Sequence, residues 1–577
     1  MGVNLTFGWL WVLAGLLGGL LLGLFFHQED WFGGYASFRV LVGGSGTYRL
    51  SASVSGGLEV DLYRAWYHHM KTPEGSPPAY WPDALVPVES AKASGRLPDP
   101  DNAVPGQTVQ EFWVDVYGPR EARPGTAAGS VTLKSGRKSL GLDVSVEVLE
   151  QVLPEEPCIT AYHKCYGSRW LRDQYPRAFA RCRDEAGAWL ATIELLHHYY
   201  RLNHEHRALF RSRGGGHAGN FDPIYSPRPV GTGRGKHLED WELFDRYNGP
   251  QFDGSVLSRA APGAPRPRRP AKSAWGAYAP ISPDWPASYL WWGQPGYQEE
   301  FVNCVRQFDG HLRERGWTAT QMEMFFFHKK RYRWFEWDGD EAKYAKDDAF
   351  FLEMWRLLRR AVDGSPVRWV LRVDASWQQK FQFERLAGAA TFWVLGGFWR
   401  WYREEIRRVV ERGDIVWWYG GTPSVDMASA GVLENVFKTW VCGLQGYNHW
   451  LATDPGPDPW FACEGASTGM LYPGERFGIA GPLSSTRLKI QRNGLQDLDL
   501  VDRAARRAGR LEAVREELSR RAPVQLWTEP PRAAQELPPE DWDSVNLSAE
   551  HEPVADQVRT RDPAWWRPVR EAALAGG

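Results

Sequence analysis

The feature that most constrains the fold is a repeated alternation of strand-like runs with amphipathic helices between residues 157 and 507. Helical patterns such as "YQEEFVNCVRQFDGHLRERG" and "WYREEIRRVVERG" separate short apolar runs. This order is typical of βα units whose strands pair in parallel. The strand-like runs lie at 158–166, 207–213, 276–285, 322–330, 368–376, 391–398, 414–421 and 447–454. We therefore expect a (β/α)8 TIM-like barrel over residues 155–522.

The residues before this region have a different texture. Short runs between 31 and 154, such as "QEFWVDVYG" and "LGLDVSVEVLE", alternate apolar and polar residues and are punctuated by Gly, Pro and Ser. Period-two alternation at this spacing predicts an antiparallel β-sandwich. A Gly-, Pro- and Arg-rich stretch at 213–275 is expected to be an insertion in the barrel. Residues 523–577 are rich in Pro and charge and are expected to form a C-terminal tail.

The first 30 residues hold a long uncharged segment, "FGWLWVLAGLLGGLLLGLFF" at 7–26. About 20 apolar residues are enough to cross a bilayer as a helix. No basic start and no A-x-A cleavage pattern are present, so the segment predicts an uncleaved N-terminal transmembrane helix. The expected location is therefore the cell membrane, single-pass with the larger part extracytoplasmic, or secreted if the segment is cleaved.

The composition favours a glycan as partner and argues against nucleic acid. The chain has 31 Trp, many of them between 275 and 460, and flat aromatic faces stack on the apolar faces of sugar rings. Lys and Arg number 68 against 70 Asp and Glu, without a long basic block. The six Cys lack C-x-x-C pairs, so no metal site and no cofactor are predicted. Disulfide pairing and oligomeric state are not determined by the sequence.

Candidate site residues follow from the barrel geometry, because active sites of such barrels lie at the C-terminal ends of the strands. The carboxylates there give Asp340, Glu341 and Asp374 as candidate catalytic residues. Polar and aromatic neighbours at the strand ends give the candidate substrate-binding residues Tyr162, His163, Asp284, Trp285, His328, Lys330, Tyr419 and Trp450.

Glycoside hydrolysis usually needs two carboxyl groups, yet the seventh strand ends in "WWYGGTPS" without one. Such a barrel could use Asp374, or it could rely on the 2-acetamido group of the substrate as nucleophile. In the second scheme one acid orients the amide and its neighbour is the acid/base. Asp340 and Glu341 could also simply begin a helix, where acids are favoured. Arg372 and Asp374 share one face of their strand, so both could point into the barrel and pair there.

The stretch 469–502, "GMLYPGERFGIAGPLSSTRLKIQRNGLQDLDLVD", resembles the C-terminal signature of domain-of-unknown-function family 4091. The matching residues are Tyr472, Pro473, Gly474, Gly481, Pro482, Ser485, Arg487, Leu488, Arg492, Gly494 and Asp497. The resemblance spans roughly residues 105–505. It implies a glycoside hydrolase-like protein related to glycoside hydrolase family 123, whose members use the substrate-assisted mechanism with an adjacent Asp and Glu.

By this resemblance Asp340 orients the acetamido group and Glu341 is the acid/base. The sequence departs from the family pattern because "HKKRYRWFEWDG" intervenes between the fourth strand and the acids, and Ala342 follows them in place of a Pro. The leading interpretation is an exported, membrane-anchored glycoside hydrolase, with 2-acetamido hexosaminides as the expected substrates and retention of configuration. The alternative is a non-catalytic glycan-binding or envelope-organising protein on the same scaffold.

Overall fold

The structure is a computed structural model, which describes most of the chain between Ala14 and Ala575. The described residues are 14–17, 20–26, 30–32, 34–70, 79–213, 222–231, 233–259, 262, 278–280, 296–319, 321–326, 339–340, 342, 345–375, 380–420, 423–426, 430–449, 451–453, 456, 459–460, 469–522, 526–529 and 566–575.

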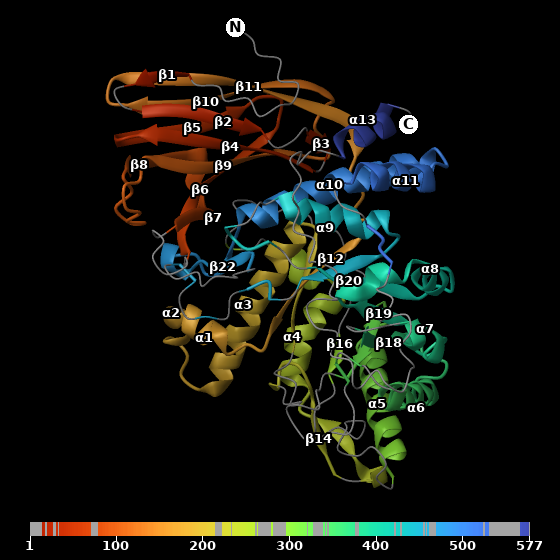
Figure 1. Cartoon of the computed structure of the whole chain (residues 1–577). Coiled ribbons are helices and arrows are strands. Elements are labelled where there is room, and N and C mark those ends of the chain that lie inside the picture. Colours follow the sequence, from red (N-terminus) through yellow and green to blue (C-terminus); the bar gives the residue numbers. More distant parts are fainter. Residues whose placement is uncertain are drawn as a thin grey trace.

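Two β-sheets face each other at the N-terminal end of the chain (Figure 1). One sheet has the strand order β1 (Ala14–Leu17), β2 (Leu20–Phe26), β4 (Gly34–Gly44), β9 (Val109–Gly118), β6 (Glu59–Met70), β7 (Ala79–Val88). The other has the order β3 (Asp30–Phe32), β11 (Lys138–Val152), β10 (Gly125–Ser135), β5 (Gly46–Val54), β8 (Lys92–Leu97). All pairs are antiparallel except that of β3 with β11. We call this unit the sandwich.

Alternation of side chains along β9 shows that both faces of this strand are buried. Phe112 and Val114 belong to the apolar core between the two sheets, where both are 0% exposed. Trp113 and Asp115 point to the opposite face and are equally buried. That face is covered by α10 (Thr486–Arg507), whose Lys489 Nζ lies 2.6 Å from an Asp115 carboxylate oxygen. The sandwich is therefore packed directly against the second half of the chain.

The second half of the chain contains a parallel sheet with helices along its outer side (Figure 1). Its strand order is β13 (Ala208–Arg213), β12 (Thr160–Tyr166), β21 (Gly446–His449), β20 (Ile415–Tyr419), β19 (Phe392–Leu395), β18 (Arg368–Ala375), β17 (Gln321–Phe325), β16 (Tyr278–Pro280). The main helices between these strands are α3 (Glu185–Glu205), α4 (Glu242–Phe252), α5 (Tyr297–Glu314), α6 (Ala345–Ala361), α7 (Lys380–Arg385), α8 (Arg403–Glu411) and α9 (Ala430–Val441). Apolar residues on the outer side of the strands and on these helices form the largest core.

Two features of the predicted fold class need correction. Within the described residues no hydrogen-bonded ladder joins β13 to β16, so the eight-stranded sheet has two edges and is not a closed barrel. The predicted transmembrane helix is wrong, because residues 14–17 and 20–26 form strands, and β2 pairs with β4 along its whole length. Across the described part of the chain, none of the helices is long and apolar enough to span a bilayer. The predicted single-pass membrane location depended on this helix and is therefore not supported.

The predicted insertion and tail contain regular structure. Residues 213–275 include the hairpin of β14 (Arg228–Val230) with β15 (His237–Glu239), and all of α4. After α10 come α11 (Leu511–Arg521) and α13 (Arg567–Ala575), and Trp566 packs against Phe437 with ring centroids 5.0 Å apart. Shorter elements follow two of the strands: α1 (Trp170–Gln174) and α2 (Pro176–Phe179) after β12, and β22 (Leu471–Pro473) paired with β23 (Pro482–Ser484) after β21.

Candidate functional site

The inner face of the parallel sheet changes from apolar to charged toward the C-terminal ends of its strands. The apolar part is a buried cluster with residues from five strands of the sheet, among them Tyr162, Val394 and Trp417. The charged part is formed by Lys164 on β12, Glu323 on β17, Arg372 and Asp374 on β18, and Tyr419 on β20. We call these five residues the inner polar cluster. Strand alternation brings them together, because Leu371 and Val373 on either side of Arg372 point outward into the helix-covered core.

Arg372 is the centre of the inner polar cluster. Its Nε and Nη2 donate to the two oxygens of Asp374 at 2.5 and 2.8 Å, and its Nη1 donates to Glu323 at 2.8 Å. The side chains of Arg372 and Asp374 are both 0% exposed. Burial opposes the guanidinium charge, but Asp374 and Glu323 outweigh it and the pKa of Arg372 lies well above its usual value. The bidentate contact thus fixes both carboxylate oxygens of Asp374.

The hydroxyl of Tyr419 connects the cluster residue on β12 to the two cluster residues on β18. It donates to Asp374 at 2.6 Å, and it accepts from Lys164 Nζ at 2.8 Å and from Arg372 Nη2 at 3.0 Å. These contacts use its one donor and both acceptor positions. Burial, followed by the charges of Asp374 and Asp340, raises the pKa of Tyr419 well above its usual value. Tyr419 is therefore a protonated, fully hydrogen-bonded phenol.

Asp340 lies beside this cluster. It is 5% exposed, and its charge is one of those that raise the pKa of Tyr419. The backbone N–H of Ala342 donates to the carbonyl oxygen of Asp374 at 3.1 Å, which anchors the segment after Asp340 at the C-terminal end of β18. Three predicted site residues, Asp340, Asp374 and Tyr419, are thus brought to one end of the sheet. Glu341 lies outside the described residues.

Two predicted site residues on β12 do not face the inner polar cluster. Tyr162 lies deeper on the inner face, and His163 lies on the opposite side of the strand. Tyr162 is on the inner face but 3% exposed, with its ring centroid 5.4 Å from that of Trp417. His163 points outward, where Nδ1 lies 2.6 Å from Asn203 Oδ1 of α3 and Nε2 contacts Gln491 of α10. Burial lowers the pKa of His163 to about 4. His163 thus joins the sheet to two helices instead of facing the site.

Asp284, Trp285, His328, Lys330 and Trp450 lie outside the described residues.

Three members of the inner polar cluster were not among the selected site residues. Lys164 and Arg372 are two residues along the strand from Tyr162 and Asp374, and the period of two places each pair on one face. This period of two predicts Lys164, and not His163, on the same face as Tyr162. Glu323 lies inside the apolar run "QMEMFFF", where a lone carboxylate flanked by buried residues indicates an ion-paired position. No sequence signal identifies Arg372 as its partner, because the two strands are far apart in the chain.

The residues that resemble the family 4091 signature hold the sandwich against the second half of the chain. Ser485 caps α10 by accepting from the N–H of Leu488 at 3.0 Å. Arg487 donates to Asp83 of β7 at 2.7 Å, and Tyr472 donates to the same carboxylate at 2.7 Å. The side chains of Asp83 and Arg487 are 3% and 1% exposed. Tyr472, Ser485 and Arg487 of the signature therefore make contacts that stabilise the structure.

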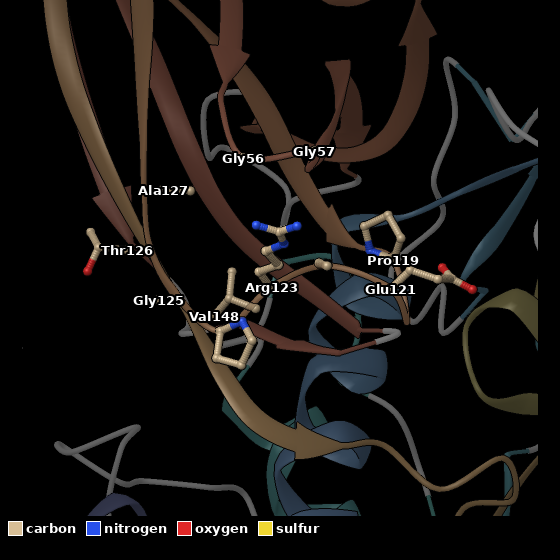
Figure 2. A pocket seen from close by; sticks show the side chains of 11 residues that line it. Gly56, Gly57, Pro119, Glu121, Arg123, Gly125, Thr126, Ala127 and Val148 are labelled. Atoms are coloured by element: carbon tan, nitrogen blue, oxygen red, sulfur yellow. The ribbon is translucent and has the colours of Figure 1, made fainter.

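A pocket of about 430 Å³ lies in the sandwich, beside the connection between β9 and β10 (Figure 2). Gly56, Gly57 and the connection from Pro119 to Ala127 line it, together with Val148, and Figure 2 shows Arg123 directed into it. Within the described residues, no group of His, Cys, Asp or Glu is arranged to hold a metal ion. The five described cysteines are free thiols.

Comparisons with known proteins identify the fold. No family model matches the chain, so membership of family 4091 is not shown. No curated protein matches it either. A family 123 glycoside hydrolase from Clostridium perfringens, studied for glycolipid glycan hydrolysis, is similar in structure with a TM-score of 0.62. The match covers 95% of this chain and 94% of that chain at 14% sequence identity.

Two further solved structures are much less similar. The CBM22-1 and GH10 modules of xylanase 10B from Clostridium thermocellum match with a TM-score of 0.30 at 9% identity, over 83% of this chain and 93% of that chain. β-Glucuronidase 2 from Bacteroides uniformis matches with a TM-score of 0.23 at 11% identity, over 74% of this chain and 45% of that chain. The similarity to the Clostridium perfringens enzyme shows that this chain has a glycoside hydrolase-like fold over 95% of its length.

Proposed function

We propose that this protein is a glycoside hydrolase whose active site lies at the C-terminal ends of β12, β17, β18 and β20. The observation that carries the proposal is the position of Asp340, a buried acid held at the end of β18 beside Asp374 and Tyr419. Carboxyl groups at the C-terminal ends of parallel strands are where glycosidases of this fold class act. The similarity in fold to a family 123 glycoside hydrolase supports the same class of reaction.

The proposed reaction is hydrolysis of a 2-acetamido hexosaminide with participation of the substrate's own amide. The acetamido oxygen attacks the anomeric carbon while the Glu341 carboxyl protonates the glycosidic oxygen, and the bond to the leaving sugar breaks. Asp340 accepts a hydrogen bond from the acetamido N–H and orients it. Water then attacks the anomeric carbon, Glu341 takes its proton, the acetamide is restored and the configuration is retained.

Asp374 has a positioning role in this scheme. Both of its oxygens are held by Arg372, and one of them also accepts from Tyr419. A carboxylate with these three contacts and 0% exposure is poorly suited to attack a sugar carbon. Its contacts instead fix Tyr419 and the segment that carries Asp340. The absence of a second carboxylate at the end of β20 is consistent with a nucleophile that the substrate supplies.

The test is release of nitrophenol from a panel of aryl glycosides that includes 2-acetamido sugars, with the full-length chain. Glu341→Gln and Asp340→Asn remove the proposed acid/base and the proposed amide acceptor. Each change is expected to lower kcat by about 10²-fold or more, the size typical of lost acid/base assistance. Asp363→Asn, at an exposed carboxylate, is the matched control and is expected to retain activity.

Two results would contradict the proposal. One is hydrolysis that is unaffected by both variants, which would move the chemistry to other residues. The other is binding of glycans without turnover of any substrate in the panel, which would establish the alternative of a glycan-binding protein.

A further inference from the structure

Strands β6 and β7 extend from the sandwich toward β22 (Figure 1). Near the end of this hairpin, Met70 and Ala79 pack against Val425 in the loop after β20. His68 Nδ1 lies 3.1 Å from the carbonyl oxygen of Pro459, in the segment after β21. Ligands of open α/β sheets bind outside the carboxyl ends of the strands. The hairpin is therefore beside the end of the sheet where the proposed site lies.

A buried ion pair holds the hairpin in this position. Arg487 of α10 donates to Asp83 of β7 at 2.7 Å and to the carbonyl oxygen of Pro423 at 2.7 Å. It also donates to the carbonyl oxygen of Gly469. Pro423 belongs to the loop after β20, and Gly469 to the segment between β21 and β22. One guanidinium thus connects the sandwich hairpin to both loops.

Trp81 is the exposed aromatic residue of this hairpin. Its side chain is 44% exposed, and the other large apolar residues with comparable exposure in the described part of the chain are aliphatic: Val109, Leu190 and Leu352. Trp81 is the cross-strand partner of His68, so the two side chains lie on the same face of the sheet. His68 contacts the segment after β21, which shows that this face is turned toward the loops of the proposed site.

We propose that Trp81 forms an outer glycan-binding subsite, in which its indole ring stacks on a sugar ring that lies beyond the bond to be cleaved. The proposal rests on the proposed function. An indole at the sandwich edge can stack on the C–H face of a sugar while its N–H remains available to a hydroxyl. A protein partner would need a contiguous apolar patch of several hundred Å², whereas Trp81 is flanked on β7 by the partly buried Tyr80 and Pro82.

The test is a calorimetric binding titration of the full-length chain with a panel of neutral and 2-acetamido oligosaccharides of one to five sugars. Wild type is expected to bind longer members more tightly than the monosaccharides. Trp81→Ala is expected to raise the Kd of the longer members about tenfold and to leave the Kd of the monosaccharides unchanged. Trp81→Phe, which keeps an aromatic face, is expected to stay within about threefold of wild type. Val109→Ala, at an exposed apolar residue of β9, is the control.

The subsite proposal is overturned if Trp81→Ala binds the longer oligosaccharides as tightly as wild type, or if length gives no gain in wild-type affinity. Hydrolysis of the same panel is measured separately. Length-dependent binding that requires Trp81, without any turnover, contradicts the proposed hydrolase and leaves the subsite in place. Turnover without an effect of Trp81 contradicts the subsite alone.

Discussion

Arg492 on α10 donates to both carboxylate oxygens of Asp115 on β9, at 2.9 and 2.8 Å. Lys489, one helical turn earlier, donates to the same carboxylate at 2.6 Å. The three side chains are at most 1% exposed, so this charged contact is dry. The sandwich and the parallel sheet therefore meet through a buried ionic junction, and the contact is specific because each charge needs its partners.

Asp115→Asn is expected to destabilise the whole protein. The change leaves two buried cations with a neutral acceptor in place of their carboxylate, and breaking such a contact costs about 3–5 kcal/mol. Guanidinium unfolding followed by Trp fluorescence measures the loss in the free energy of unfolding. Asp143→Asn, at an exposed carboxylate of the sandwich, is the control. A difference below about 1 kcal/mol between the two variants would contradict a tight junction.

The same junction has a pH dependence of known sign. Burial alone would raise the pKa of Asp115, but Arg492 and Lys489 hold it well below its usual value. A depressed carboxyl pKa contributes stability that is present above the unfolded-state value near 4 and is lost as the pH falls through the folded-state value. Asp115→Asn is therefore expected to weaken the loss of stability below about pH 4.

Gly474→Ala is expected to destabilise the hairpin of β22 and β23. A Cβ at Gly474 would lie 2.3 Å from the carbonyl oxygen of Gly481, a backbone atom that cannot move without distorting the hairpin. Forced contacts of this kind cost about 1–3 kcal/mol. Gly310→Ala in α5 is the control, because its Cβ would meet no atom closer than 3.9 Å. Equal melting temperatures for the two variants would contradict the steric argument.

Buried histidines predict a loss of stability in mild acid. Burial lowers the pKa of His68 and of His163 from 6.5 to about 4. The unfolded chain then binds more protons than the folded one below pH 6.5, so the stabilising contribution is complete above 6.5 and falls toward pH 4. Each histidine contributes on the order of 3 kcal/mol across this interval.

This dependence is measured by guanidinium unfolding between pH 7 and pH 4.5. His163→Gln removes one titrating ring and is expected to reduce the slope of stability against pH. His237 is an exposed histidine whose pKa is raised by its hydrogen bonds to Gly235 and Glu239, so His237→Gln is expected not to reduce the slope. A wild-type stability that is flat over this interval would show that the folded and unfolded chains bind equal numbers of protons, which contradicts the lowered pKa values.

Arg372→Met is expected to be strongly destabilising at neutral pH. It removes the cation between Asp374 and Glu323 and leaves two carboxylates in a buried site, a change that costs about 3–5 kcal/mol. The loss in the free energy of unfolding is measured by guanidinium unfolding followed by Trp fluorescence. Arg368→Met, at the exposed first residue of β18, is the control. A difference below about 1 kcal/mol between the two variants would contradict this account of the inner polar cluster.

Elements that depend on local pattern could be predicted from the sequence. The strand positions from 158 to 454 and the helix that follows Ser485 were readable because alternation and capping involve residues close in the chain. Within a strand the same reasoning placed Arg372 and Asp374 on one face. It failed for the described residues 14–17 and 20–26 of the apolar segment, because short uncharged apolar runs also form buried strands.

The sequence by itself determined the order of strands and helices, the end of the sheet where candidate acids gather, and a signature over 469–502. Only the tertiary structure decided that His163 faces two helices, that Glu323 shares Arg372 with Asp374, and that Arg487 and Arg492 join α10 to the sandwich. The physical reason is the separation along the chain between the residues that interact. Periodicity and capping act within a few residues, whereas buried charges are satisfied by partners that lie dozens to hundreds of residues away, and only folding brings them together.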